Sequence, residues 1–462
     1  MEKNLRLIPK MDDFLEDPDI FCFKSELSGK TVVRVLREEI ENLRGLIKSG
    51  GFLGDKSAAF EYVKRNAVLL LEKKKTDRLK RVINATGIII HTNLGRAPLS
   101  GEIMKKVSEA VTGYNNLEYS FTDGKRRGRM FYLEELLRDI TSAEAALVVN
   151  NNAAAIFLVL NTLCKNKEVI ISRGEIVEIG DSFRISEIIK ESGCIIKEAG
   201  TTNKTRPGDY ENLITEYTSA FLKVHQSNFK IIGFTGEASS LELVELKSKY
   251  PGNDMVVIED MGSGILSDLS AYGLKKERTA EDALNDGVDI VTFSGDKILG
   301  GPQAGIIIGK KKYVDLMKKN QMYRCLRIDK MCLAALEAAL CLYRGGDALK
   351  IPVIRSIAEA KALIYEKANK LNAMLNGVGV DCRVGPHTAL LGGGALPGET
   401  IDSFAVFVAI KGKSAREIDI YLRHQTIPII STIQNEEIIL DMRTVDEGDF
   451  EYLRNTLAEL CK

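Results

Sequence analysis

Three short segments, far apart in the chain, carry residue types that could together hold an anion and activate an amine. The first is NNNAAA at 150–155, which follows the apolar run ALVV. Asn151, Asn152 and Ala153 would stand where a strand gives way to a helix, so free backbone N–H groups and the helix dipole could hold a phosphate. An ordinary Asn N-cap explains the same residues equally simply.

The second and third segments supply an acid and a nucleophile. Asp260 ends the apolar run MVVIED, where its carboxylate could pair with a protonated ring nitrogen or cap a turn. Lys297 lies in SGDKILGG, where desolvation would make its amine neutral and nucleophilic, although a lysine in a glycine-rich loop is usually solvated. Ser294 could donate to a phosphate, and Asp296 could assist proton transfer or be a plain loop carboxylate. This order of anion cup, acid and lysine predicts pyridoxal phosphate attached to Lys297.

The elements that must position these residues are predicted by apolar runs that alternate with helical patterns from about residue 140. The predicted strands are ALVVN, EVIIS, CIIKE, KIIGF, MVVIED, DIVTF and AGIIIG. Seven such strands predict an α/β fold with a mainly parallel seven-stranded sheet. The order of the functional segments is that of the aspartate-aminotransferase-like superfamily (fold type I).

Three regions are predicted along the chain. Residues 1–75 show helical periodicity and form a helical module. Residues 76–345 form the catalytic domain, in which 76–140 are a linker and helical lead-in. Residues 346–462, after the joint RGGDALKIPVI, form a small α+β C-terminal domain.

The composition excludes several protein classes. Lys plus Arg and Asp plus Glu each number 64, so net charge does not indicate nucleic-acid binding, and any RNA contact must come from local patches such as 73–81 or 125–129. The eight cysteines form no CxxC pair, and the four histidines lack metal-ligand spacing, so we expect reduced thiols and no metal site. The start lacks a basic region followed by an apolar run, and no apolar stretch could span a membrane, so we expect a cytoplasmic protein.

Several motifs resemble one family almost from end to end. They include INATGIIIHTNLGRA (83–97), SGDKILGGPQAG (294–305), YRCLRIDK (323–330), GGGALPGE and LDMRTV. These resemble bacterial selenocysteine synthase, the L-seryl-tRNA(Sec) selenium transferase. The resemblance implies that seryl-tRNA(Sec) is dehydrated to a pyridoxal-bound aminoacrylate, with Lys297 as base, and that selenophosphate then supplies selenium to give selenocysteinyl-tRNA(Sec).

The resemblance also implies residue roles and partners. Arg96, Arg324 and Arg327 match the arginines that bind selenophosphate in the family, although structural ion pairs are an alternative. The helical module would grip the tRNA, and the enzyme would be a homodecamer. Cys325 would be a packing thiol or would touch the selenium chemistry, and Asp181 stands where a glycine is expected.

Two other functions remain open at this point. A paralogous pyridoxal-dependent lyase would act on a small amino acid or an amino sugar phosphate, but such paralogues generally lack the helical module. A tRNA-binding protein without catalytic activity would have lost catalytic residues. Here Asp260, Ser294, Lys297 and the three arginines are all present. Residues in motifs that look functional but have no assigned role are Glu178, Arg184, Thr202, Asn203 and His225.

Overall fold

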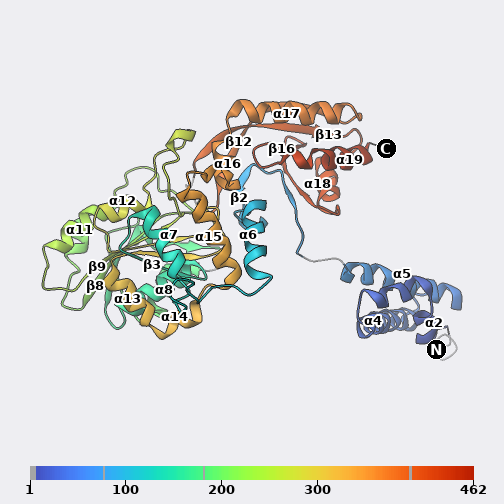
Figure 1. Ribbon diagram of the computed structural model, residues 1–462. Helices are drawn as coiled ribbons and strands as arrows, with labels where there is room; N and C mark the ends of the chain where they lie inside the picture. Colours follow the sequence, from blue (N-terminus) through green and yellow to red (C-terminus); the bar gives the residue numbers. More distant parts are fainter. Residues whose placement is uncertain (1–6, 76–78, 181–182, 395–397, 462) are drawn as a thin grey trace. The chain divides into compact units, whose positions relative to one another are not determined.

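The computed structural model describes residues 7–75, 79–180, 183–394 and 398–461, so Asp181 lies outside the described residues. The chain divides into two compact units, residues 1–81 and residues 82–462 (Figure 1). Within the described residues, no helix is both long and apolar enough to cross a membrane.

The first unit is helical, as the sequence predicts. Its helices are α2 (Met11–Leu15), α3 (Pro18–Phe21), α4 (Gly29–Lys48) and α5 (Lys56–Lys75). The long helix α4 begins where the Ser28 hydroxyl accepts from the backbone N–H of Thr31, and its apolar face packs against α5. Phe14 stacks on Phe60 with 4.6 Å between ring centroids. The unit therefore has its own apolar core.

The second unit contains the expected seven-stranded sheet, with strand order β3-β11-β10-β9-β8-β4-β7. Every neighbouring pair is parallel except the two that involve β11. The strands are β3 (Ala145–Val149), β4 (Glu168–Ser172), β7 (Ile195–Ala199), β8 (Thr218–Val224), β9 (Val256–Gly262), β10 (Ile290–Ser294) and β11 (Gly305–Gly309). Most are fully buried, which is why they read as continuous apolar runs.

One predicted strand is wrong. KIIGF at 230–234 forms no strand, and Ile232 and Phe234 are 86% and 94% exposed. The seventh strand is instead β8, whose sequence TSAFLKV begins with polar residues and was overlooked for that reason. The other six predicted strands are confirmed. Length and apolar content alone do not distinguish a buried strand from an exposed apolar loop.

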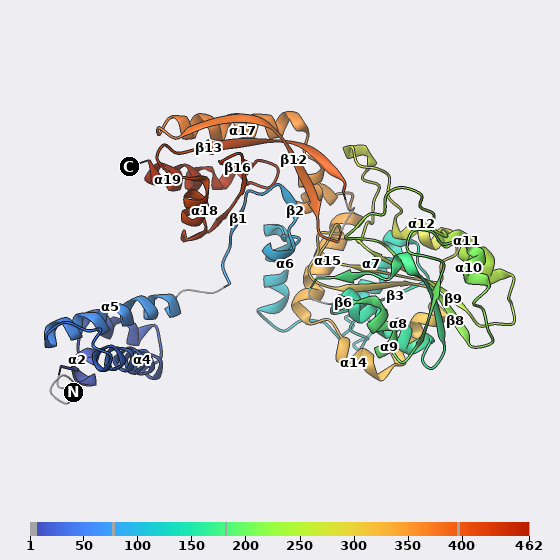
Figure 2. The ribbon, with the colours of Figure 1, turned by 180° about the vertical axis from the view of Figure 1, so that it is seen from behind.

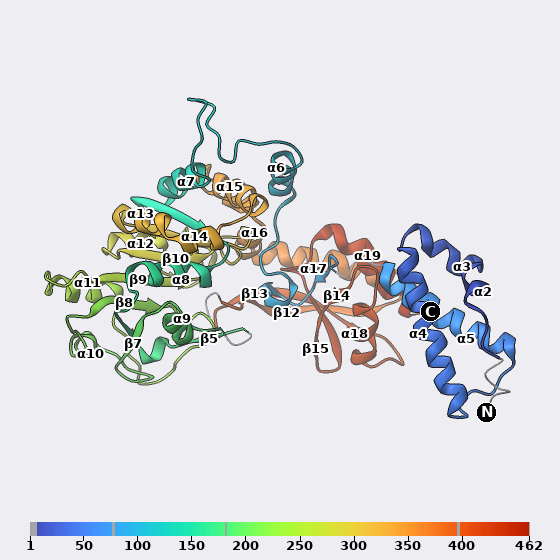
Figure 3. The same cartoon turned by 90° about the horizontal axis from the view of Figure 1, so that it is seen from below.

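Helices cover the sheet and extend the unit. α8 packs against β3, β10 and β11, and α7 packs against β3. The chain between α6 and α7 projects away from the sheet (Figure 3). The helices are α6 (Gly101–Val111), α7 (Phe131–Thr141), α8 (Asn152–Leu163), α9 (Ile185–Glu191), α10 (Pro207–Glu211), α11 (Ser240–Ser248), α12 (Ala280–Asn285), α13 (Lys311–Lys319), α14 (Gln321–Leu326) and α15 (Lys330–Arg344).

A second sheet, of five strands, belongs to the C-terminal α+β part, which the sequence also predicts. Its order is β15-β16-β13-β12-β2, and helix α17 lies along the long β12 and β13 ribbon (Figure 2). Its strands are β2 (Ile88–Ile90), β12 (Asp381–Gly392), β13 (Thr400–Ala409), β15 (Thr432–Gln434) and β16 (Glu437–Asp441). The remaining helices are α16 (Pro352–Ala358), α17 (Lys361–Asn376), α18 (Ala415–Arg423) and α19 (Phe450–Leu460).

The segment that leads into the large domain takes part in this second layer. β1 (Ile83–Asn84) pairs with β14 (Ile429–Ile430), and β2 pairs with β12. The chain therefore passes through the C-terminal layer before it reaches Arg96 and α6. This path brings the HTNLGRA motif and the GGG motif to the same place.

Candidate active site

The carboxyl ends of β9 and β10 and the start of α8 bring Asp260 together with two hydrogen-bond donors. Asn152 Nδ2 donates to Asp260 Oδ1 at 2.7 Å, and Thr292 Oγ1 donates to the same oxygen at 3.2 Å. Asp260 is only 8% exposed, and this burial raises the pKa of its carboxyl group, against the opposing effects of Asn152 and Lys297. Burial thus disfavours the charged carboxylate, and a cation beside Asp260 would stabilise it.

Lys297 follows β10 and is also 8% exposed. Burial lowers the pKa of its amine; Asp260 opposes this effect and Arg96 adds to it. A Cβ on Gly394 would lie 2.5 Å from Lys297 Nζ, so only a glycine lets the chain pass the amine at this point. Gly394 belongs to the GGG motif, which the sequence flagged without explaining.

The residues expected to hold a phosphate lie at neighbouring strand ends. The Asn151 side chain accepts from the backbone N–H of Ala154 at 2.8 Å, so it caps α8. Asn152 uses its amide nitrogen on Asp260, while its Oδ1 is buried and has no partner among the described residues. Ala153 lies in the first turn of α8, and Ser294 is the buried last residue of β10.

Arg96 and Asp296 form an ion pair at the same site. Arg96 NH1 donates to Asp296 Oδ2 at 2.6 Å, and the backbone N–H of Ala97 donates to the Asp296 carbonyl at 3.3 Å. Arg96 has φ of 61°, a left-handed conformation that is uncommon outside glycine. The fold thus brings Arg96 and Asp296 to Lys297, although 200 residues separate the partners of the pair.

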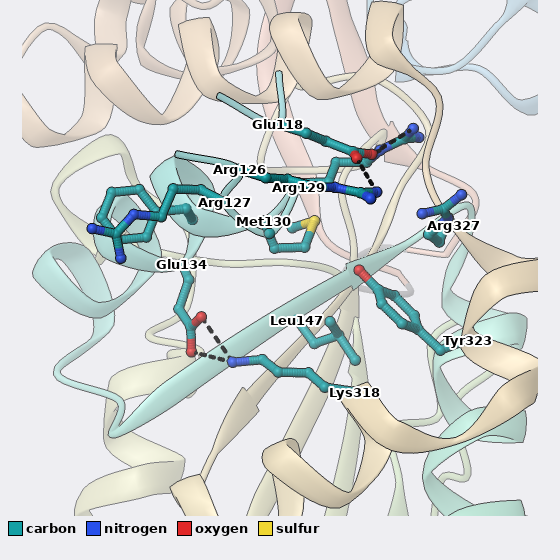
Figure 4. A pocket seen from close by; sticks show the side chains of 12 residues that line it. Glu118, Arg126, Arg127, Arg129, Met130, Glu134, Leu147, Lys318, Tyr323 and Arg327 are labelled. Atoms are coloured by element: carbon teal, nitrogen blue, oxygen red, sulfur yellow. Dashed lines mark hydrogen bonds and ion pairs between the residues drawn. The ribbon is translucent and has the colours of Figure 1, made fainter. Parts of the chain in front are cut away.

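The other two predicted arginines lie differently. Arg327 lines a cavity of about 550 Å³ together with Arg127 and Tyr323, and Figure 4 shows no interaction between its guanidinium and the other side chains drawn. Its backbone bridges Val149, just before the Asn151 turn. Arg324 is exposed on α14, and no described residue of the Lys297 site pairs or hydrogen-bonds with it. The structure therefore does not gather all three arginines.

The basic segment 125–129 lies at the same cavity. Glu118 binds both Arg126 and Arg129, and Glu134 binds Lys318 (Figure 4). These cations are already paired within the chain, so the segment is less available for phosphates than its sequence suggests.

The sequence missed Ser227. Its side chain is 2% exposed, and its hydroxyl has no partner among the described residues. Both this hydroxyl and Lys297 Nζ lie 3.9 Å from the position that a Cβ on Gly262 would take. The turn that follows β8 is held by Gln226, which donates to the Gly174 carbonyl, and by Asn228, which donates to the Glu178 carbonyl. The VHQSN motif indicated a functional segment, but the motif alone did not show where the Ser227 hydroxyl lies.

Four residues without an assigned role now have contacts. Arg184 donates to Glu178 at 2.6 Å across the small hairpin of β5 (Glu178–Ile179) and β6 (Phe183–Arg184). Asn203 donates to the Phe234 carbonyl, and His225 lies 3.3 Å from Glu277. Cys325 is exposed on α14.

A mainly parallel seven-stranded sheet with a buried lysine and a buried acid at its carboxyl edge defines an enzyme of the aspartate-aminotransferase-like class. The solved D-glucosaminate-6-phosphate ammonia-lyase shares this fold, with a TM-score of 0.59 at 22% identity over 83% of this chain and 96% of that one. Among the described residues, no group of three or more His, Cys, Asp or Glu side chains could hold a metal ion.

Residues 82–446 match the family model described as L-seryl-tRNA selenium transferase. The L-seryl-tRNA(Sec) selenium transferase of Clostridium botulinum (strain Okra / Type B1) is 46% identical over 99% of both chains. That of Caldanaerobacter subterraneus subsp. tengcongensis is 44% identical over 100% of this chain and 99% of its own. The chain belongs to the L-seryl-tRNA selenium transferase family.

Proposed function

We propose that this protein converts L-seryl-tRNA(Sec) to L-selenocysteinyl-tRNA(Sec), with selenophosphate as the selenium donor and pyridoxal phosphate held on Lys297. Relatives with this activity in their names match the chain over nearly its whole length. The observation that carries the proposal is the buried pair of Lys297 and Asp260, with Arg96 beside them.

The residues present fit the cofactor. Asp260 is a buried carboxylate in need of a cation, and the buried oxygens of Asn152 and Ser227 lack partners among the described residues. Lys297 and Asp260 would hold the ring, and Ser294 and the first turn of α8 would hold the phosphate. When bound, pyridoxal phosphate supplies an electron sink that makes the α-proton of serine acidic.

Lys297 would do the proton chemistry, with Asp296 beside it. Because burial lowers the pKa of the Lys297 amine, a neutral amine is available to take the α-proton. Asp296 accepts a hydrogen bond from Arg96 at 2.6 Å, which fixes its orientation next to the lysine. The Lys297 ammonium formed when the amine takes the α-proton could return the same proton to the β-hydroxyl, which would leave as water, while Asp296 would orient the amine.

Arg96, Arg324 and Arg327 would bind selenophosphate. Arg96 uses one guanidinium nitrogen on Asp296, so its other N–H groups could meet a tetrahedral oxyanion. Arg327 is supported by its position next to Val149 and by its unpaired guanidinium. Arg324 has no such support from its present exposed position.

The remaining assignments concern the setting of the enzyme. The helical unit, which ends in the basic residues Lys73, Lys74 and Lys75, would grip the tRNA. The enzyme would be a homodecamer, as the family resemblance implies, and it would be cytoplasmic, as expected from the sequence.

The decisive experiment combines the purified protein, pyridoxal phosphate, seryl-tRNA(Sec) and selenophosphate, and identifies the aminoacyl product by mass. Selenocysteine on the tRNA is expected from the wild type, and none from Lys297→Ala or without selenophosphate. A wild type that carries the cofactor yet leaves serine unchanged would rule the proposal out.

A further inference from the structure

A cavity of about 450 Å³ opens beside Lys297 in the second unit. Its lining includes Ser227 and Gly393, and the neighbouring Gly394 touches the lysine amine. Ile90 and Leu390 give it an apolar wall. Among the described residues that line it there is neither a lysine nor an arginine, so it suits an uncharged group better than a phosphate.

A second cavity, of about 360 Å³, adjoins the first. Glu399 lines both, and the segment 225–230 separates them, with Ser227 and Asn228 on the first and Phe229 and Lys230 on the second. The lining of the second cavity also includes Lys275, Lys276 and Arg278. The neutral space beside Lys297 therefore continues into a basic one.

Charge in the second cavity is only partly compensated. Its carboxylates are already paired, namely Glu237 with Lys223, Glu259 with Arg278, Glu277 with His225 and Glu399 with Lys275. Lys230 and Lys276 are exposed and form no ion pair with a described residue. Lys276 nevertheless lies close enough to Asp268 and Asp282 to help lower the pKa of both carboxyl groups. Two lysines thus remain available for an anionic ligand.

The loop after this segment presents apolar side chains to solvent. Phe229, Ile232 and Phe234 are exposed, and the loop is anchored by Asn203, which donates to the Phe234 carbonyl. Exposed aromatic rings next to unpaired lysines are the combination that binds single-stranded RNA, because rings stack on bases and lysines meet phosphates.

We propose that the two cavities receive the single-stranded 3′ end of the aminoacylated RNA, an inference that rests on the proposed function. The terminal nucleoside, which carries the seryl ester, occupies the neutral cavity beside Lys297. The preceding phosphates lie at Lys230 and Lys276, and a base stacks on Phe229.

The first test measures steady-state kinetics on the holoenzyme with seryl-tRNA(Sec). Lys230→Glu combined with Lys276→Glu should raise KM for the tRNA about tenfold and reduce the salt slope of binding by about two. The visible absorbance of the cofactor and KM for selenophosphate should not change. Phe229→Ala should raise KM for the tRNA about tenfold as well. Lys249→Glu, at an exposed lysine that ends α11, is the matched control and should have no effect.

The second test uses tRNA(Sec) with a photoreactive 8-azidoadenosine as its 3′-terminal nucleoside. Crosslinks on the peptides that contain Asn93 or residues 225–234 are expected, and crosslinks only elsewhere would overturn the proposal. If Phe234→Ser lowers the oligomeric mass while KM for the tRNA is unchanged in every variant, the loop contacts a second copy of the chain instead. If the wild type makes no selenocysteinyl-tRNA, the proposed function is wrong. If the wild type is active and the variants keep its KM for the tRNA, only this inference is wrong.

Discussion

Two clusters of buried charged side chains in the second unit differ in the number of hydrogen bonds that their polar groups form. In the C-terminal layer, Asp441 is fully buried and accepts from Ser403 Oγ at 2.7 Å and from the backbone N–H of Arg443 at 2.8 Å. His387 Nδ1 lies 2.6 Å from its second oxygen. Arg443 in turn donates through its terminal nitrogens to three backbone carbonyls, those of Ser356, Glu359 and Asp402, while its Nε is buried and has no partner among the described residues.

The polar groups of the Lys297 site form fewer hydrogen bonds. The Lys297 amine forms no hydrogen bond with a described residue, and Asn152 Oδ1 and Ser227 Oγ are buried without partners in the same part of the chain. Unmet hydrogen bonds cost stability, so a fold keeps them where a ligand completes them. The comparison distinguishes a cluster that links the C-terminal layer to the chain around α16 from a site beside Lys297 with unpartnered polar groups.

The largest expected effect comes from removing the Lys297 amine. Lys297→Ala should lower the rate of product formation by about a thousandfold or more, because it removes both the attachment point and the base. The free energy of unfolding of the cofactor-free protein should not fall, since the variant removes a desolvated amine that forms no hydrogen bond with a described residue. Product formation and urea unfolding, measured side by side, check this, and a variant that simply unfolds would contradict the comparison.

The cluster of Asp441 and Arg443 should show the reverse pattern, a loss of stability without a loss of activity. Arg443→Ala removes the donor to three part-buried hydrogen bonds, so it should lower the free energy of unfolding by about 3 kcal/mol. The folded fraction should keep its activity, because Arg443 touches no reacting group. Urea unfolding with Arg454→Ala, at a less buried arginine of α19, as control measures the difference. Loss of activity without loss of stability would assign Arg443 to the active site.

A finer comparison concerns the pKa of the Lys297 amine. Because Asp260 raises this pKa and Arg96 lowers it, Asp260→Asn should lower it further and Arg96→Met should raise it. The pH dependence of acylation of the amine in the cofactor-free protein, followed by peptide mass, measures both shifts, with Lys249 as the exposed reference. Shifts in the same direction for both variants would show that these side chains do not face the amine.

The lowered pKa of the Lys297 amine also makes the free energy of unfolding depend on pH. The folded protein favours the neutral amine, so the stabilisation from this group is present above the ordinary pKa of lysine and is lost as the pH falls through the lowered value. In Lys297→Met this part of the pH dependence should disappear.

The smallest effect is expected at the surface hairpin. The Arg184 and Glu178 side chains are about half exposed, so their ion pair is screened by water. Arg184→Ala should therefore change neither the unfolding midpoint nor the activity measurably. A marked loss of tRNA turnover in this variant would instead give the ISRGEIVEIGDSFR motif a direct functional role.

Residue types and their order predict an acid and a lysine at the strand ends. Asp260 and Lys297 could be predicted together because the carboxyl ends of neighbouring parallel strands meet at one edge of a sheet, whatever the details of packing. The apolar runs of β3, β4, β9, β10 and β11 were readable for a related reason, since strands covered on both faces must be apolar throughout. The sixth correctly predicted strand, β7, is a partly exposed edge strand.

Only the tertiary structure decided the contacts that join distant segments. The Arg96 and Asp296 pair, the approach of Gly394 to the lysine and the unpartnered Ser227 hydroxyl depend on how β2, β12 and β8 are placed. KIIGF reads as a strand and lies exposed, while TSAFLKV forms the strand, because pairing and burial are not local properties. Residue type and order specify which groups react, but side-chain direction is fixed by packing between layers that the sequence does not display.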